Sequence, residues 1–424
     1  MSKKNIWIIN HYATNMFYNK AGRHYWFAKY LKSEGYNPVI FSCNVKHGVL
    51  ERYIDTKDLW VEQEAEEIQV PFIFVKSNLY ENSGIKRILN MLGFYKNVKI
   101  SAEEYAKKRG NPDVIYASSV HPLTLVAGIQ LAKHFGIKCI CEVRDLWPES
   151  IVAYSKKLTK SNVMIKLLYK GEKWIYSKAD KLIFTMEGGS DYIKDKGWNN
   201  KKKRSIDISK IYHINNGVDL KSFYKNKSLH ITNDNDLIDD KTFKVIYTGS
   251  IRPANNVKKI VEAAKDIQER GFNKIKFMIY GEGSDRIPLM NYCMENNINN
   301  VFFKGHVDKC QVPYILNQSD LNILHFEQNS LNQYGSSLNK MFEYFASGKP
   351  TLSDCEFGYD LINRYKAGVS KDITNSEEFA GEILKFYQMD KQKYEEYSSN
   401  ALKAAKDYDF KLLTQRLIDI IERV

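Results

Sequence analysis

Residues 243–280 read FKVIYTGSIRPANNVKKIVEAAKDIQERGFNKIKFMIY, and the order of apolar and polar positions in this stretch decides the fold. The apolar runs Phe243–Tyr247 and Lys276–Tyr280 flank an amphipathic segment, Val257–Arg270. Short apolar runs are typical of buried strands, and the segment between them is long enough for a helix. This order predicts a strand, a helix and a second strand parallel to the first.

The same alternation continues on both sides of this unit. Further strands are expected at Ile6–Asn10, Pro38–Ser42, Val114–Ala117, Lys138–Glu142, Lys181–Thr185, Ile211–Asn215, Val301–Lys304 and Leu321–Leu324. Helices are expected at Gly22–Glu34, Leu123–Phe135, Met164–Ser177, Arg286–Asn296, Val312–Gln318 and Ser337–Ala346. Two successive runs of this kind predict an α/β protein with two doubly wound, Rossmann-like domains.

A chain of 424 residues is too long for one ordinary core. We expect a first domain over residues 1–205 and a second over residues 206–400. The hinge is placed in or near the polar, basic stretch Asn199–Lys210. The remaining residues, 401–424, carry a helix at about Phe410–Arg423 whose apolar face is expected to pack on the body.

Composition excludes several classes of protein. Hydrophobic residues make up 43% and charged residues 27%, values typical of folded globular chains. No apolar run approaches the ~18 residues of a membrane-spanning helix, and the start of the chain does not resemble a secretion signal. The six cysteines lack C-x-x-C spacing, which favours a reducing cytoplasm.

The net charge of +13 predicts attraction to a polyanion without saying which one. Anionic lipid, phosphorylated small molecules and nucleic acid all qualify, but no nucleic-acid-binding motif is present and that partner is not expected. Basic clusters lie around Lys86-Arg87, at Lys107–Arg109 and at Lys201–Arg204. Each cluster is either a binding surface or an ordinary solvated face.

Phosphate binding is expected where loops follow the strands of the second domain, because ligands of open parallel sheets lie beyond the carboxyl ends of the strands. The first such loop carries Gly249, Ser250 and Arg252, a glycine, a hydroxyl and a guanidinium suited to a diphosphate. The next two loops carry Gly281 and the pair His306-Val307.

The densest group of polar residues lies in residues 334–350, YGSSLNKMFEYFASGKP. Ser336 and Ser337 would offer hydroxyls and free amides to phosphate at a helix N-terminus. Asn339 and Glu343 share one helix face, where a carboxylate can accept hydrogen bonds from the two hydroxyls of a ribose. The alternative interpretation is a capped surface helix with an ordinary ion pair.

The first domain carries weaker candidates. Gly22 opens a helix and either admits a diphosphate or forms a plain turn, and His121 follows a strand and is either functional or structural. Residues 142–150, EVRDLWPES, concentrate four charges after a buried strand, which are functional or mutually paired. Asp145 and Glu149 are the candidates for the acceptor side.

Together these motifs resemble glycosyltransferase family four, in particular its bacterial branch that builds O-antigen and capsular polysaccharide. The resemblance rests on the order and spacing of Glu142–Ser150, Ile214–Asp219, Tyr247–Ser250 and Lys340–Pro350. It implies a GT-B fold, in which two Rossmann-like domains face each other across a cleft.

The resemblance also implies roles for single residues. Glu343 matches the second glutamate of the family's Glu, seven residues, Glu motif, which holds the nucleotide ribose. Arg252 resembles the arginine that binds the donor diphosphate, and Gly22 the glycine loop near that diphosphate. His121 resembles the histidine that lies against the donor sugar, and His306-Val307 the base-recognition loop. One departure stands out, because Gly335 occupies the place of the first glutamate.

The expected function is retaining transfer of a sugar from a nucleotide-diphosphate donor, preferably a UDP-sugar, to a lipid-linked or saccharide acceptor in cell-surface polysaccharide biosynthesis. Arg252, Lys340 and helix-terminal amides would stabilise the leaving group without a metal or other cofactor. Asp234 and Asp236 have Asp-x-Asp spacing but lie in an Asn-rich loop with no strand before them. A UDP-sugar epimerase and a non-catalytic nucleotide-binding protein remain the alternatives.

A lipid-linked acceptor would bring the chain to the anionic inner face of the plasma membrane, where Lys and Arg clusters are attracted. Residues Ile85–Val98 combine apolar side chains with Lys86, Arg87 and Lys96. This pattern is typical of a helix lying in the membrane interface, and an ordinary core-facing helix is the alternative.

Overall fold

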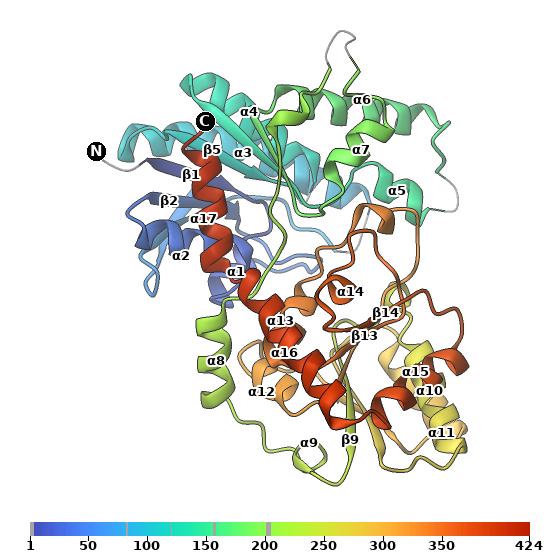
Figure 1. The fold of residues 1–424 in the computed structure, drawn as a ribbon. Helices are drawn as coiled ribbons and strands as arrows, with labels where there is room; N and C mark the ends of the chain where they lie inside the picture. Colours follow the sequence, from blue (N-terminus) through green and yellow to red (C-terminus); the bar gives the residue numbers. More distant parts are fainter. Residues whose placement is uncertain (1–3, 82–83, 120, 156–157, 201–204) are drawn as a thin grey trace. The chain divides into compact units, whose positions relative to one another are not determined.

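The computed structural model describes residues 4–81, 84–119, 121–155, 158–200 and 205–424. The basic cluster Lys201–Arg204 therefore lies outside the described residues. The chain forms two compact units, Met1–Asn215 with Phe410–Val424 and Asn216–Asp409. Figure 1 traces both units in sequence colours.

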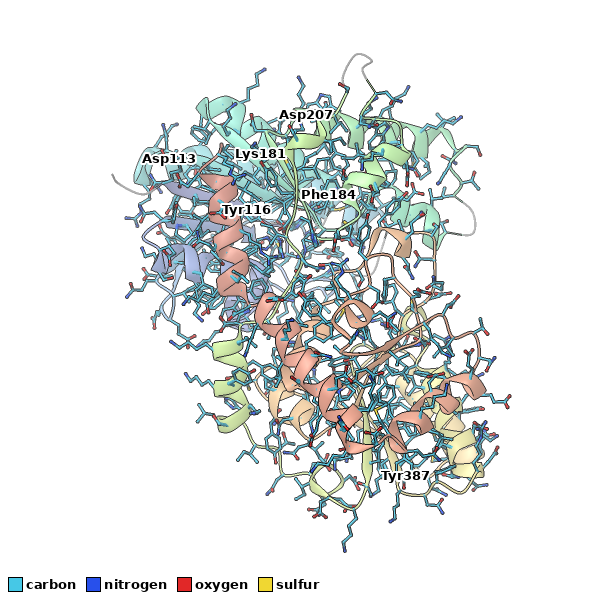
Figure 2. The ribbon with its side chains drawn as sticks, viewed as in Figure 1. Asp113, Tyr116, Lys181, Phe184, Asp207 and Tyr387 are labelled. Carbon is cyan, nitrogen blue, oxygen red and sulfur yellow. The ribbon has the colours of Figure 1, made fainter. Side chains whose placement is uncertain are left out.

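In its described part, the first unit contains an eight-stranded sheet with the order β3-β4-β2-β1-β5-β6-β7-β8. Its strands are β1 (Asn5–Ile9), β2 (Asn37–Cys43), β3 (Trp60–Ala65), β4 (Val70–Val75), β5 (Val114–Ser118), β6 (Lys138–Val143), β7 (Lys181–Phe184) and β8 (Ile211–His213). Every neighbouring pair is parallel except β3 and β4. Figure 2 marks Lys181 and Phe184, the two ends of β7.

The helices of this unit are α1 (Thr14–Tyr18), α2 (Arg23–Ser33), α3 (Ile85–Arg109), α4 (Pro122–Phe135), α5 (Glu149–Tyr154), α6 (Val163–Lys178), α7 (Gly189–Asp195) and α17 (Phe410–Ile421). Apart from the helix at residues 85–98, the predicted strands and helices are present with ends shifted by at most two residues. The helix expected at 85–98 is longer and ends at Arg109.

The pair β3 and β4 was not predicted. β3 reads WVEQEA and is half-exposed at the edge of the sheet, so no apolar run marks it. β4 reads VPFIFV and is buried, but it contains a proline, which is unusual inside a strand. Pro71 lies opposite Glu64 of the edge strand β3.

The second unit contains, in its described part, a six-stranded parallel sheet with the order β11-β10-β9-β12-β13-β14. Its strands are β9 (Phe243–Thr248), β10 (Ile275–Tyr280), β11 (Val301–Gly305), β12 (Leu321–Leu324), β13 (Thr351–Ser353) and β14 (Gly368–Ser370). Its helices are α8 (Leu220–Leu229), α9 (Asn235–Ile238), α10 (Lys258–Glu269), α11 (Arg286–Glu295), α12 (Val312–Asn317), α13 (Asn339–Ser347), α14 (Leu361–Tyr365), α15 (Ser376–Tyr387) and α16 (Lys391–Asp407). The strands β13 and β14 have three residues each, too few to show a periodic pattern.

The units divide between Asn215 and Asn216, whereas residues 205 and 206 were the expected boundary. The reason is that β8, at Ile211–His213, pairs with β7 and stays in the first sheet. The tail also divides, because α16 belongs to the second unit and α17 packs on α2 of the first. On α17 the apolar face is buried at Leu413 and Leu417, while Leu412 is exposed.

No helix in the described ranges is both long enough and apolar enough to cross a membrane.

Candidate nucleotide site

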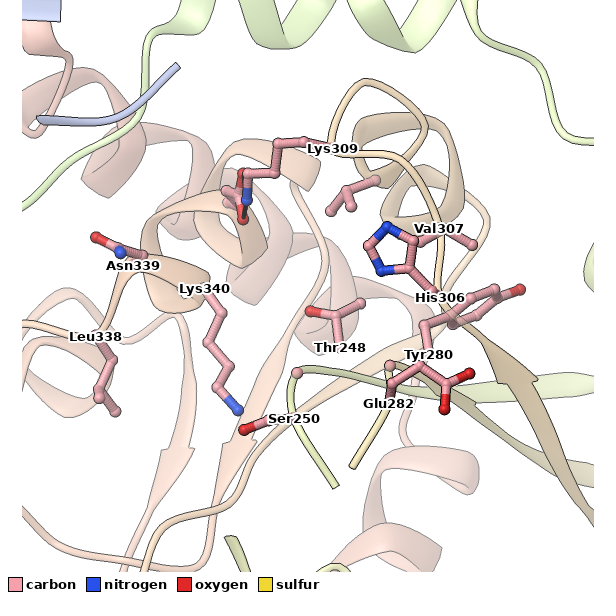
Figure 3. A pocket seen from close by; sticks show the side chains of 14 residues that line it. Thr248, Ser250, Tyr280, Glu282, His306, Val307, Lys309, Leu338, Asn339 and Lys340 are labelled. Atoms are coloured by element: carbon pink, nitrogen blue, oxygen red, sulfur yellow. Dashed lines mark hydrogen bonds and ion pairs between the residues drawn. The ribbon is translucent and has the colours of Figure 1, made fainter. Parts of the chain in front are cut away.

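The second unit has a pocket of about 480 Å³ where β9, β10 and β11 end and α13 begins (Figure 3). It is lined by Thr248, Gly249, Ser250, Tyr280, Gly281, Glu282, His306, Val307, Lys309, Val312, Leu338, Asn339, Lys340 and Glu343. Seven of the predicted donor residues and Lys340 thus come together: Gly249, Ser250, Gly281, His306, Val307, Asn339 and Glu343. This is the edge of a parallel sheet at which ligands are expected.

Two glycines that line this pocket, Gly249 and Gly281, are fixed by backbone contacts. The Gly249 amide donates to the Tyr280 carbonyl at 2.9 Å, and the Gly281 amide donates to the Gly305 carbonyl at 2.8 Å. A Cβ atom on Gly281 would lie 1.8 Å from the Gly249 carbonyl oxygen, and Gly281 has a φ of +143°. Only glycine fits here, because a side chain would force the two loops apart.

Tyrosine hydroxyls join β9 to the neighbouring elements of the site. Tyr344 of α13 accepts a hydrogen bond from the Thr248 amide at 3.1 Å and contacts the Thr248 hydroxyl at 3.1 Å. Tyr247 donates to the Ser250 carbonyl at 3.1 Å. These bonds set the first two turns of α13, which carry Asn339, Lys340 and Glu343, beside the glycine loop.

Lys340 carries the most informative charge in the pocket. Its Nζ lies 4.2 Å from the centre of the Tyr247 ring and 3.0 Å from where a Cβ of Gly249 would be. This nitrogen is buried and has no hydrogen-bond partner in the part of the chain that the structure describes. Burial lowers the pKa of Lys340 to about 8, and the charge of Asp354 acts in the opposite direction. A buried ammonium without a partner is costly and calls for an anion.

Glu343 lies one turn after Asn339 on the same face of α13. Its carboxylate forms an ion pair with Lys309 at 2.6 Å, and its side chain is 16% exposed. A carboxylate oxygen has several lone pairs, so this pairing leaves Glu343 able to accept hydrogen bonds from vicinal hydroxyls. His306 is exposed at the rim, where the chain leaves β11 at Gly305.

Three predicted residues of the second unit do not line this pocket. Arg252 is exposed and precedes a short 3-10 helix, Pro253–Asn255. α13 begins at Asn339, after Ser336 and Ser337, and its N-cap Leu338 provides no side-chain cap. Ser337 instead accepts from the Asn216 amide at 3.3 Å, and its carbonyl accepts from the Asn216 side chain at 2.7 Å. The serines were expected to open the helix, but it starts two residues later than Ser337.

The departure at Gly335 has a conformational reason. Its φ is +92°, a region that glycine adopts without cost and a glutamate would occupy only under strain. The chain here leaves the short 3-10 helix Asn332–Tyr334. The backbone conformation at this position therefore suits glycine rather than the family's glutamate.

His121 and Gly22 belong to the first unit. His121 is buried at the start of α4, and its Nε2 lies 2.6 Å from the Nδ1 of His11. Burial, with a contribution from Arg87, lowers the pKa of His121 to about 3, so the ring is neutral at pH 7. Gly22 precedes α2 with a φ of +118°, and a Cβ there would lie 2.8 Å from Met16.

Two of the four charges in residues 142–150, Glu142 and Glu149, are paired with residues outside this stretch. Glu142 is buried and accepts from Arg23 and Ser118, at 2.7 Å and 2.8 Å. Arg23 also donates to the carbonyls of Ile214 and Asn215, which ties β8 to α2. These bonds give Glu142 a structural role.

Of the two acceptor-side candidates, Glu149 is buried among partners and Asp145 is exposed. Glu149 forms ion pairs with Lys160, at 2.8 Å, and with Lys196, and it accepts from Tyr169. These bonds join α5 to α6 and to the residue after α7. Asp145 is therefore the more accessible of the two carboxylates.

Asp234 and Asp236 are engaged in ion pairs. Lys304 lies 2.8 Å from Asp234 and 2.7 Å from Asp236, and Asp234 also caps α9. In the described ranges no three His, Cys, Asp or Glu side chains converge as metal ligands would.

Sequence reasoning missed Lys309, since a single lysine in a loop carries no motif. It included Tyr247 in the motif Tyr247–Ser250 but gave this residue no role of its own. Their roles depend on which residue each one faces in the folded unit.

Comparison with solved structures defines the class of fold. The chain superposes on HepE of Anabaena in complex with UDP and glucose with a TM-score of 0.66, at 14% identity over 99% of this chain and 100% of that one. It superposes on the α,α-trehalose 6-phosphate synthase of Burkholderia multivorans with a TM-score of 0.72, at 10% identity over 99% and 98% of the two chains. These proteins share the GT-B fold, so the two predicted Rossmann-like domains are confirmed.

A family match covers part of the chain. Residues 231–404, most of the second unit, match the family glycosyl transferases group 1. The chain therefore has the GT-B fold, and residues 231–404 are similar to the glycosyl transferases group 1 family.

Two curated relatives are similar over part of their length. TuaH of Bacillus subtilis, named as a teichuronic acid biosynthesis glycosyltransferase, is 27% identical over 214 residues, 50% of this chain and 49% of TuaH. The uncharacterised glycosyltransferase MJ1069 of Methanocaldococcus jannaschii is 23% identical over 260 residues, 59% of this chain and 60% of the relative. The matched region spans about half or somewhat more of each relative.

Proposed function

We propose that the second-unit pocket binds the nucleoside diphosphate of a UDP-sugar and that the protein transfers this sugar to an acceptor. The observation that carries the proposal is the ammonium of Lys340, which is buried beside Gly249 without a hydrogen-bond partner in the described chain. A diphosphate oxygen would supply that partner. The amides and dipole at the start of α13 would add to the attraction.

The same groups would act in the reaction. Negative charge develops on the leaving diphosphate as the bond to the sugar breaks, and a preorganised cation in a poorly solvated site stabilises that charge. Glu343 would orient the nucleotide through its ribose hydroxyls. Transfer would retain the configuration at the anomeric carbon, as the resemblance to family four implies, with attack on the face that the leaving group departs from.

We propose UDP as the nucleotide because HepE, a protein of the same fold, is known in complex with UDP. We propose a role in cell-surface polysaccharide biosynthesis because TuaH is named for such a pathway. The acceptor would be a saccharide, preferably one carried on a lipid diphosphate, and would meet the first unit near Asp145 and His121.

One experiment separates this function from its two alternatives. The purified protein is incubated with each common UDP-sugar, with and without a lipid-linked saccharide extract, and both UDP and the sugar are analysed. Acceptor-dependent release of UDP supports transfer. An isomerised donor in the absence of acceptor points to an epimerase, and saturable binding without turnover of any donor points to a nucleotide-binding protein.

Contact with an anionic membrane would bring the protein to a lipid-linked acceptor, and two helices of the first unit provide a surface for it. The first turns of α3 expose four apolar side chains: Ile85, Ile88, Leu89 and Leu92. Asn90 and Phe94 of the same helix are buried, so one face of α3 packs on the core while another exposes apolar side chains to solvent. α6 exposes Val163, Met164, Leu167 and Leu168 in its own first turns.

Both apolar faces lie at the same edge of the first sheet. α4 packs against α3 and against α6, so the three helices form one layer. α3 ends before β5 begins and α6 ends before β7 begins, so each helix starts near the carboxyl edge of the parallel sheet. The exposed Lys86 and the exposed Lys166 and Lys170 flank these faces, and no acidic residue occurs in 85–102 or 163–171. This combination is suited to anionic lipid.

Vesicle co-sedimentation tests this surface. Leu167→Asp should reduce binding to vesicles that contain phosphatidylglycerol, while binding of UDP stays unchanged. Met294→Asp is the matched control, because Met294 is also an exposed apolar residue and lies on α11 of the second unit. Equal loss in both variants, or equal binding to neutral and anionic vesicles, would contradict the membrane contact.

A further inference from the structure

A cluster of ionisable side chains meets at Asp354. This residue follows β13 and is 2% exposed. Its Oδ2 lies 2.7 Å from the Nζ of Lys259 and 2.5 Å from the Nδ1 of His325. Lys259 comes from α10 and also donates to the Ile373 carbonyl, while His325 follows β12.

The other carboxylate oxygen of Asp354 has a different environment. Oδ1 is buried and has no hydrogen-bond partner within the described ranges, and the same holds for the Nζ of Lys340. β9, β12 and β13 are neighbours in the parallel sheet, so Gly249, His325 and Asp354 follow adjacent strands at one edge. Asp354 is the acidic group whose charge raises the pKa of Lys340 against the effect of burial.

We infer that Asp354 is a positioning residue that keeps the ammonium of Lys340 protonated and directed into the pocket, and that Lys259 and His325 hold Asp354 in place. The inference rests on the proposed binding of a nucleoside diphosphate. It assigns a task to three residues that none of the sequence motifs includes.

The neighbours of Lys340 leave this task to Asp354. From β9, Tyr247 offers only its ring face, and from the loop after it Gly249 offers backbone. On the same helix, Glu343 is engaged by Lys309 at 2.6 Å. Lys259 and His325 both contact Asp354.

The consequence is a defined dependence of nucleotide affinity on pH. The pKa of Lys340 is lowered to about 8, so its ammonium is lost as the pH rises through that value and affinity for an anion falls. Without the carboxylate of Asp354, burial would act unopposed and the loss would occur at lower pH. The window from pH 7 to 9.5 is suitable, because the second ionisation of a terminal phosphate, near pH 6, is then complete.

The test is calorimetric titration of the full-length protein with UDP across this window. The affinity of the wild type for UDP should be about tenfold lower near pH 9, because one pH unit above the pKa only about a tenth of the lysine is still protonated. Asp354→Asn should show the same loss at least half a pH unit lower and bind within threefold of the wild type at pH 7. Lys259→Gln should also shift the loss to lower pH, by a smaller step, because Asp354 loses the ion pair that holds it.

Arginine at position 340 supplies the control for mechanism. Lys340→Arg keeps its charge throughout the window, since the guanidinium pKa exceeds 12, and its affinity should not change with pH. The affinity of the double variant Lys340→Arg/Asp354→Asn for UDP should likewise not change with pH. Asp320→Asn is the matched control for removal of a carboxylate, because Asp320 pairs with Lys244 at 3.8 Å and does not line the pocket.

The inference is overturned if Asp354→Asn weakens binding by the same factor at every pH, or if the double variant keeps the shift. If Asp354→Asn does not fold, Lys259→Gln decides, and an unshifted profile in that variant overturns the inference. Absence of UDP binding by the wild type at every pH would instead contradict the proposed function itself.

Discussion

The ammonium of Lys340 lies 4.2 Å from the centre of the Tyr247 ring and is buried there. A ring face attracts a cation, with about 2 kcal/mol when the pair is desolvated, but it supplies no hydrogen-bond acceptor. The contact therefore holds the charge in place and leaves its three N–H groups available. A ligand phosphate would complete the arrangement.

Removing this ammonium should separate ligand affinity from stability. Lys340→Met should weaken UDP binding about 10- to 100-fold, the range for a lost hydrogen bond to a charged group. The thermal midpoint of the ligand-free protein should rise, because a buried cation without a partner is replaced by an apolar side chain. Lys258→Met is the control, since Lys258 is exposed and pairs with Glu262 at 3.4 Å. Unchanged affinity in both variants would place the diphosphate elsewhere.

Arg252 provides a contrast between resemblance and structure. The resemblance implies contact with the donor diphosphate, yet Arg252 is exposed and outside the pocket lining. Arg252→Ala should therefore change the affinity for UDP less than about threefold, as is usual for exposed charges. Titration of UDP measures this. A loss comparable to that of Lys340→Met would show that Arg252 reaches the diphosphate when the ligand is bound.

Glu343 should accept hydrogen bonds from the ribose hydroxyls of the nucleotide. Glu343→Gln should lower the affinity for UDP about tenfold and reduce the preference for UDP over 2′-deoxy-UDP, because a neutral amide is a weaker acceptor than a carboxylate. Competition between the two nucleotides measures the preference. Glu282→Gln is the control on another wall of the same pocket, where Glu282 lies 3.5 Å from Arg286. Equal effects on both nucleotides would argue against a ribose contact.

The close approach at Gly281 should make this position intolerant of any side chain. Gly281→Ala should cost about 2 kcal/mol or more in unfolding free energy, since overpacking adds to the strain of a positive φ. Gly271→Ala is the matched control, with a φ of +85° and no atom within 4 Å of the added Cβ. Chemical denaturation of both variants measures the difference. Equal costs would mean that φ alone, and not the contact with Gly249, requires glycine.

Glu172 on α6 should make stability depend on pH. It is buried, accepts from Tyr176 and Tyr192 at 2.9 Å each, and burial raises its pKa to about 8 from 4.5. Between these values the folded chain holds a proton that the unfolded chain has lost, so the unfolding free energy falls as the pH rises from about 5 to 8. In Glu172→Gln, the thermal midpoint should no longer show this part of its dependence on pH. At pH 8 the variant should be more stable than the wild type. If the thermal midpoints of the variant and the wild type changed with pH in the same way, this prediction for Glu172 would be contradicted.

Most strands and helices could be predicted from the sequence because their apolar positions repeat with the period of the element. Phe243–Thr248 and Lys258–Glu269 are examples, found within one residue or so of their expected ends. β13 and β14 escaped because three residues show no period, and β3 because an edge strand is half-exposed. The end of the first unit was misplaced because pairing of β8 with β7 is a long-range interaction.

The sequence by itself determined that the chain forms two α/β units built on parallel strands. It also determined that glycine, lysine and glutamate residues follow the strands of the second unit. These features depend on local periodicity and on motifs, which a linear pattern contains. Only the tertiary structure decided that Lys340 lies beside Gly249 while Arg252 and Ser337 do not line the pocket, and that Lys259 and His325 meet at Asp354. Burial and the absence of a partner are properties of side chains brought together from distant strands, so no single stretch of sequence encodes them.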